Sequence, residues 1–124
     1  MTEAKKPTVL IVDDDLSVRE SFALVLEELY QIEMIASGHS ALERIKQGDV
    51  DLVFLDVRMP GVDGLETLRQ IKQLSPQLPV IMVTAASDLD FSNEAINAGA
   101  AKYIMKPFEV SEILKTAKEM IKGK

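Results

Sequence analysis

The stretch DLVFLDVRMPGVDG, residues 51–64, places an acidic residue directly after an uninterrupted apolar run. The run ends at Leu55, Asp56 follows it, and then Pro60 and Gly61 favour a turn. Such a run, bounded by turn residues, is typical of a strand buried on both faces of a sheet. An ionised carboxylate at the end of a buried strand is costly unless a partner compensates its charge. Asp56 is therefore a candidate functional residue.

Four other apolar segments alternate with segments of helical periodicity around this strand. The predicted strands cover residues 8–13, 30–35, 50–56, 79–85 and 101–106. The predicted helices cover residues 17–29, 40–47, 64–74, 88–98 and 110–121. Five alternations of an apolar strand with an amphipathic helix predict an α/β fold, a parallel sheet covered by helices on both faces.

Two details of the helices are also predicted. Ser17 and Glu20 match a capping box, which starts the first helix at Ser17 and places Leu29 on its inward face. In the fourth helix, Leu89 and Ile96 define the inward stripe, and Asn93 falls on it.

A second apolar stripe of the fourth helix contains Phe91, Ala95 and Ala98. Two interpretations of Phe91 remain open. Either a slight rotation of the helix buries its ring, or the ring is exposed and marks a partner site.

Length and composition narrow the class of protein. The chain has 124 residues, 47% of them apolar, which predicts a single domain at residues 1–124, structured over about residues 7–122. It has no cysteine, which excludes a disulfide scaffold and a thiolate metal site. The net charge of −6 argues against a dominant nucleic-acid-binding surface. No apolar run is long enough to span a bilayer, and the first residues do not resemble a secretory signal, so we expect a cytoplasmic protein without membrane contact.

Chemically distinctive residues lie at the ends of four of the five predicted strands. Asp13 ends the first strand and Asp14 follows it, Asp56 ends the third, Thr84 lies near the end of the fourth and Lys106 ends the fifth. In parallel sheets, ligands bind beyond the carboxyl ends of the strands, so these side chains are expected to converge. Clustered carboxylates without cysteine favour Mg²⁺. Phosphoryl transfer fits this set, with Asp56 as nucleophile, Lys106 neutralising charge and Thr84 orienting the group.

The sequence resembles the receiver domain of two-component response regulators. The stretches that carry the resemblance are VLIVDDD (9–15), LVFLDVRMPGVDG (52–64), VIMVTA (80–85) and NAGAAKYIMKPF (97–108), in the order of the family. The resemblance implies a flavodoxin-like (βα)5 sandwich with strand order 2-1-3-4-5.

The resemblance also implies a function. The chain would accept a phosphoryl group on Asp56, in a Mg²⁺-dependent reaction, from a phosphohistidine of a sensor histidine kinase or a histidine phosphotransfer protein. It would relay the event as a conformational change of the face formed by helix four, strand five and helix five. A downstream effector or a fused output domain would then bind the altered face. Such a module catalyses its own phosphorylation and slow dephosphorylation and is not a turnover enzyme.

Roles for individual residues follow from the same resemblance. Asp13 and Asp14 resemble the metal-binding pair, and the backbone carbonyl of Arg58 resembles a further ligand beside Asp56. Thr84 and Tyr103 resemble the switch residues, and Lys106 resembles the lysine on the phosphate side. Pro107 resembles a proline preceded by a cis peptide bond. Asp15 has no role in the family pattern beyond its negative charge.

Two other functions were weighed against this one. A haloacid-dehalogenase-like phosphatase uses an Asp-x-Asp motif, which Asp13 and Asp15 match superficially, but it needs a further acidic motif after its lysine, where only Glu109 stands. A degenerate receiver would bind partners without phosphorylation, and the complete set of Asp14, Asp56, Thr84 and Lys106 speaks against it.

Overall fold

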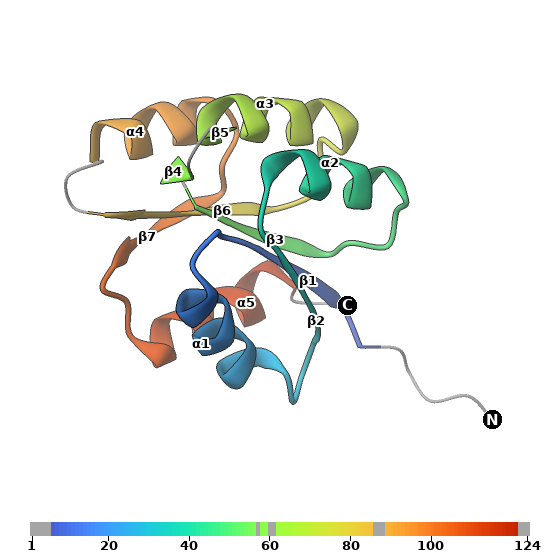
Figure 1. Cartoon of the computed structure of the whole chain (residues 1–124), viewed down its shortest axis with the longest axis vertical. Coiled ribbons are helices and arrows are strands. Elements are labelled where there is room, and N and C mark those ends of the chain that lie inside the picture. The colour runs from blue at the N-terminus through green and yellow to red at the C-terminus, as the bar shows by residue number, and fades with distance from the viewer. Residues whose placement is uncertain (1–5, 57, 60–61, 86–88, 122–124) are drawn as a thin grey trace.

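The chain forms three layers, with one sheet between two groups of helices (Figure 1). The computed structural model describes residues 6–56, 58–59, 62–85 and 89–121, with the side chains of 58–59, 62–63 and 89–92 outside that description. Its strands are β1 (Thr8–Val12), β2 (Gln31–Ile35), β3 (Leu52–Asp56), β4 (Arg58–Met59), β5 (Val62–Asp63), β6 (Val80–Ala85) and β7 (Lys102–Lys106). Its helices are α1 (Leu16–Leu26), α2 (Gly38–Lys46), α3 (Gly64–Leu74), α4 (Leu89–Asn97) and α5 (Val110–Met120).

The main sheet is parallel and has the strand order β2-β1-β3-β6-β7. Because β6 and β7 are its fourth and fifth strands along the chain, this is the order 2-1-3-4-5, and the predicted flavodoxin-like fold is confirmed. The antiparallel pair of β4 and β5 directly follows β3 and was not predicted. No helix within the described ranges is both long enough and apolar enough to cross a bilayer.

The side chains of each strand point alternately to the two faces of the sheet, which divides the core into two halves. Successive side chains of a strand point to opposite faces, so Val53 and Leu55 of β3 pack on one side, and Leu52 and Phe54 pack on the other. The first half lies under α2, α3 and α4, and the second under α1 and α5 (Figure 1). All five residues of β3 are buried, including Asp56. The central strand is therefore held on both faces, and it ends in the acidic residue.

The start of the first helix differs from the prediction. The N-cap is Asp15, whose side chain accepts a hydrogen bond from the backbone N–H of Ser17, and the helix begins at Leu16. Asp and Ser are both favoured at N-caps, and Asp15 takes the position because its carboxylate reaches the first-turn donors. The predicted inward position of Leu29 is also wrong, because α1 ends at Leu26 and the Leu29 side chain is 46% exposed.

The predicted inward stripe of the fourth helix is wrong as well. Ala95 is fully buried and Ala98 packs against the core, whereas Asn93 is exposed and Ile96 is 41% exposed. The small alanine side chains allow α4 to pack closely on the sheet, and this outweighs the larger apolar area of Ile96. The side chain of Phe91 lies outside the described part of the chain, so both interpretations of it remain predictions.

Candidate active site at the carboxyl edge of the sheet

Three carboxylates meet at the carboxyl edge of the sheet. Asp13 directly follows β1 and Asp56 ends β3, and these two strands are neighbours in register, with Val12 beside Leu55. Asp13, Asp14 and Asp56 each offer an oxygen, and the three oxygens lie within 4.8 Å of one another. Asp13 is 3% exposed and Asp56 is 7% exposed, while Asp14 is exposed to solvent. The predicted convergence of these three residues is therefore present.

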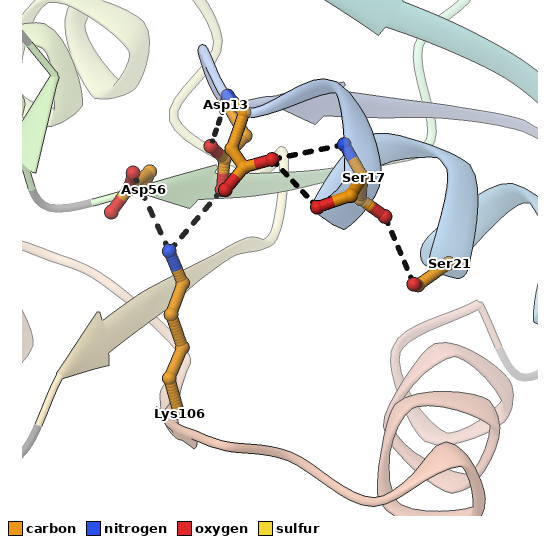
Figure 2. Close-up of polar contacts among 6 residues, drawn as sticks. Asp13, Ser17, Ser21, Asp56 and Lys106 are labelled. Atoms are coloured by element: carbon orange, nitrogen blue, oxygen red, sulfur yellow. Dashed lines mark hydrogen bonds and ion pairs between the residues drawn. The ribbon is translucent and has the colours of Figure 1, made fainter.

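A lysine lies between the two buried carboxylates. The Nζ atom of Lys106, at the end of β7, is 3.5 Å from Oδ2 of Asp13 and 3.6 Å from Oδ2 of Asp56 (Figure 2). Both distances exceed the about 2.7–3.2 Å of a close N–H···O hydrogen bond, so the attraction is largely Coulombic. One ammonium group therefore offsets part of the charge of two buried carboxylates.

Thr84 lies on the strand between the acidic residue and the lysine. It belongs to β6, which separates β3 from β7, and its side chain is fully buried. The hydroxyl group donates a hydrogen bond of 3.2 Å to the carbonyl oxygen of Ala85. The register pairs Val83 with Asp56 and Ala85 with Lys106, so Thr84 sits at the same edge as both.

Tyr103 lies two register steps before Thr84 in the ladder of β6 and β7. It lies on β7 beside Met82 of β6, is half-buried, and packs against the core half that α2, α3 and α4 cover. Its backbone is thus linked through the β6–β7 ladder to the strand that carries Thr84.

A chain of hydrogen bonds holds the acidic loop before α1. The backbone N–H of Asp13 donates to the carbonyl of Ile35 at 3.0 Å, and its Oδ1 accepts from the backbone N–H of Asp15 at 2.9 Å. Oδ1 of Asp15 accepts from the N–H and the hydroxyl of Ser17 at 2.9 and 2.8 Å, and the Ser21 hydroxyl donates to the Ser17 carbonyl at 2.9 Å (Figure 2). The acidic loop is therefore held by hydrogen bonds that involve Asp13 itself, its neighbour Asp15 and two serines of the first helix.

These contacts give Asp15 a role that the sequence analysis missed. The hydrogen bonds from the side chain and backbone of Ser17 lower the pKa of the Asp15 carboxyl below its ordinary value. A carboxylate that accepts such bonds at a helix N-terminus is stabilised in its charged form. The signal was available, because an Asp followed two residues later by Ser is a known turn pattern.

The donor set fits a hard divalent cation. The cluster presents carboxylate oxygens only, two buried and one exposed, which is the pattern of an ion that keeps part of its water shell. The backbone of Arg58 lies in β4, two residues after Asp56, and its side chain is outside the described part. The peptide bond between Lys106 and Pro107 is cis, as the resemblance implied.

Comparisons with known proteins all find similarity to response regulators and their receiver domains. The family model of the response regulator receiver domain matches residues 9–118. The transcriptional regulatory protein ZraR of Salmonella typhimurium is 36% identical over 121 residues, 94% of this chain and 26% of ZraR. The DNA-binding transcriptional regulator NtrC of Klebsiella pneumoniae is 43% identical over 103 residues, 82% of this chain and 22% of NtrC. The chain thus spans about a quarter of the length of these curated relatives.

Solved structures agree in fold and in extent. A CheY-like response regulator receiver domain protein from Methanospirillum hungatei superposes with a TM-score of 0.88 at 35% identity, covering 95% of this chain and 94% of that one. The receiver domain of NtrX from Brucella abortus superposes with a TM-score of 0.87 at 32% identity, covering 94% of this chain and 99% of that one.

Proposed function

This chain belongs to the response regulator receiver domain family, and from that membership we propose that it is a signalling switch activated by phosphorylation of Asp56. The donor is a phosphohistidine of a sensor histidine kinase or of a histidine phosphotransfer protein. One observation carries the proposal. The Asp56 carboxylate, at the end of the central strand, lies within 4.8 Å of two further carboxylates and 3.6 Å from the Lys106 ammonium.

The proposed reaction is a displacement at phosphorus. A carboxylate oxygen of Asp56 forms a bond to the phosphorus atom, and the bond between phosphorus and the imidazole nitrogen breaks. The electron pair leaves with the imidazole, which accepts a proton from solvent if it departs as the anion. An ionised carboxylate needs no general base, so positioning and charge neutralisation are what the site must supply.

The surrounding residues would supply both. Lys106 would neutralise charge on a phosphoryl oxygen and the Thr84 hydroxyl would donate to another, which is supported by the ammonium 3.6 Å from Asp56 and by Thr84 at the same edge of the sheet. Asp13, Asp14 and Asp56, with the backbone carbonyl of Arg58, are the residues that would hold Mg²⁺. When bound, Mg²⁺ offsets the repulsion between the acceptor and the incoming phosphoryl group.

Phosphorylation would then bias a two-state equilibrium of the domain. Thr84 turns toward the phosphoryl group and vacates space that the Tyr103 ring enters, which reshapes the face of α4, β7 and α5. The positions of the two residues support this proposal, because Thr84 on β6 and Tyr103 on β7 lie on neighbouring strands, two register steps apart. The chain returns to its first state by slow hydrolysis of the acyl phosphate, without turnover of a separate substrate.

The partners follow from this scheme. A kinase or phosphotransfer protein delivers the phosphoryl group, and a downstream effector or a fused output domain reads the altered face. ZraR and NtrC are transcriptional regulators longer than this chain, which supports a receiver coupled to a separate output function. The net charge of −6 supports an arrangement in which this chain itself does not contact nucleic acid.

Intact-protein mass spectrometry after incubation with acetyl phosphate and Mg²⁺ tests the proposal. We expect one phosphoryl adduct on the unaltered chain, none on Asp56→Asn, and a normal adduct on the matched control Asp49→Asn. Asp49 is a suitable control because it is exposed, lies outside the carboxylate cluster, and has a positive φ of 64° that asparagine also adopts. A stable protein without any adduct would identify a binding module instead, and continuous release of phosphate over many turnovers would identify a phosphatase.

A further inference from the structure

Three phenylalanine rings form a continuous series of contacts within the core half under α1 and α5. The ring centroids of Phe22 and Phe54 are 4.9 Å apart, and those of Phe22 and Phe108 are also 4.9 Å apart. The ring planes are tilted by 54° and 58°, within the range of arrangements that the quadrupoles of aromatic rings favour. Phe22 is therefore the common neighbour of the other two rings.

Each ring belongs to a segment that carries a residue of the site. Phe54 lies on β3, two residues before Asp56, and Phe108 lies two residues after Lys106. Phe22 lies on α1, the helix that directly follows the acidic loop, and α1 lies beside α5 on one face of the sheet (Figure 1). The aromatic series therefore joins the three segments that must keep their relative positions for the site to work.

Phe108 is the member of the series that a connecting segment contributes. Phe22 and Phe54 are each 1% exposed, while Phe108 is half-buried and packs against the same core half. Its neighbours Pro107 and Glu109 are exposed, so among residues 107–109 only Phe108 packs against the core. Phe108 is thus the side chain that anchors this connecting segment to the core.

Lys106 needs such support because its own contacts are weak. It is the last residue of β7 and pairs with Ala85, the last residue of β6. Its side chain is 29% exposed, and its ion pairs of 3.5 and 3.6 Å are too long to hold the ammonium group by themselves. The direction in which the backbone leaves the strand therefore matters for where the ammonium lies.

We infer that Phe108 is a positioning residue for Lys106 in the proposed phosphorylation of Asp56. Packing of Phe108 against Phe22 fixes the chain that follows Lys106 relative to the acidic loop and β3. The ammonium is thereby kept between Asp13 and Asp56, where it meets the incoming phosphoryl group. The inference rests on the proposed function and adds to it a residue that touches neither substrate nor metal.

A double-mutant cycle on the full chain tests this inference. Phe108→Leu removes the ring contact, and we expect phosphorylation by acetyl phosphate at saturating Mg²⁺ to slow by about tenfold, because small displacements of a charge-neutralising group are costly. In a Lys106→Met background, which already lacks the ammonium, Phe108→Leu is expected to change the rate by less than about twofold, since the two substitutions remove the same interaction. Phe108→Tyr keeps the ring and is expected to retain the rate of the unaltered chain.

A control variant separates positioning from general loss of packing. Leu114 of α5 packs against the same core half and is also half-buried, so Leu114→Ala is expected to lower the melting temperature while leaving the phosphorylation rate unchanged. If Phe108→Leu does not fold, Phe108→Met takes its place in the cycle.

The outcomes are distinguishable. A Phe108→Leu variant that matches the unaltered rate overturns the inference, and so does a rate effect of the same size in both Lys106 backgrounds. If the unaltered chain itself forms no adduct, the proposed function fails, and this inference fails with it.

Discussion

The ammonium nitrogen of Lys106 lies 3.6 Å from Oδ2 of Asp56, although β6 separates the strands on which the two residues stand. The long lysine side chain spans the width of that strand, which carries the buried Thr84. The same ammonium lies 3.5 Å from Oδ2 of Asp13. One ammonium group thus faces two carboxylates that come from the ends of two other strands, and the predictions below follow from this arrangement.

Removal of this cation is expected to slow phosphorylation. Lys106→Met keeps the length of an apolar chain but loses the charge, and the loss of one preorganised group of this kind slows a reaction by about a hundredfold. The rate of adduct formation with acetyl phosphate measures the effect. Lys102→Met is the matched control, because Lys102 lies on the same strand and donates instead to the Thr116 hydroxyl at 3.3 Å. Equal rates in the two variants would contradict the role of Lys106.

Mg²⁺ is expected to stabilise the folded chain through the carboxylate cluster. At a free concentration of about a hundred times its dissociation constant, a ligand that binds only the folded state adds about 2.7 kcal/mol to the free energy of unfolding. Thermal melts with and without Mg²⁺ should therefore differ for the unaltered chain, and the difference should be lost in Asp14→Asn. Asp14 is exposed, so this substitution disturbs packing little. A full Mg²⁺ effect in Asp14→Asn would remove Asp14 from the metal site.

Asp15 is expected to make stability depend on pH in the acidic range. The hydrogen bonds from Ser17 lower the pKa of the Asp15 carboxyl in the folded chain below its value in the unfolded chain. The folded state therefore binds fewer protons than the unfolded state between these two pKa values. The stabilisation is complete above the unfolded pKa and is lost as the pH falls through the folded one.

Urea unfolding of the unaltered chain and of Asp15→Asn between about pH 6 and about pH 3 measures this effect. The asparagine side chain of this variant retains an oxygen that can accept the hydrogen bond from the Ser17 N–H, but it carries no charge. We expect the unaltered chain to be the more stable at the upper end of the range and the difference to shrink at the lower end. A difference that does not change with pH would show that the charge of Asp15 is unimportant for the cap.

The packing of α4 gives a matched pair of substitutions. Ala95 is fully buried, so Ala95→Leu is expected to lower the free energy of unfolding by about 1–3 kcal/mol through overpacking. Ile96 is 41% exposed, so Ile96→Ala is expected to change it by less than about 0.5 kcal/mol. Chemical denaturation of both variants measures these changes. If Ile96→Ala lowered the free energy of unfolding more than Ala95→Leu, the stripe that periodicity predicted would be correct and the observed stripe would be wrong.

Periodicity in the sequence predicted the sheet and its helices because the strands are short, apolar and bounded by clear turn residues. The run that ends at Asp56 is the best example, since every residue of β3 is buried as expected. The carboxylate cluster and Lys106 followed from the strand ends, because parallel strands deliver their last residues to one edge. The fold and the main charged residues of the site were thus predictable from local patterns.

The errors arose where local patterns allow two answers. Asp15 and Ser17 are both residue types favoured at N-caps, so the sequence alone does not show which of them starts the helix. The path of the chain from β1 places the Asp15 carboxylate where it accepts a hydrogen bond from the backbone N–H of Ser17. In α4, helical spacing does not show whether small Ala95 or larger Ile96 faces the sheet, because close approach of the backbone depends on tertiary packing. The contact between Phe22 and Phe108 joins distant segments, so no local pattern could have predicted it.

The identity of the phosphorylated residue is the central claim, and chemical trapping tests it most directly. Borohydride reduces an aspartyl phosphate to homoserine, which peptide mass spectrometry then locates in the chain. After phosphorylation in the presence of Mg²⁺, we expect homoserine at position 56 and at no other aspartate. Homoserine at position 13 or 14, or its absence from a chain that carries a phosphoryl adduct, would contradict the assignment of Asp56 as the acceptor.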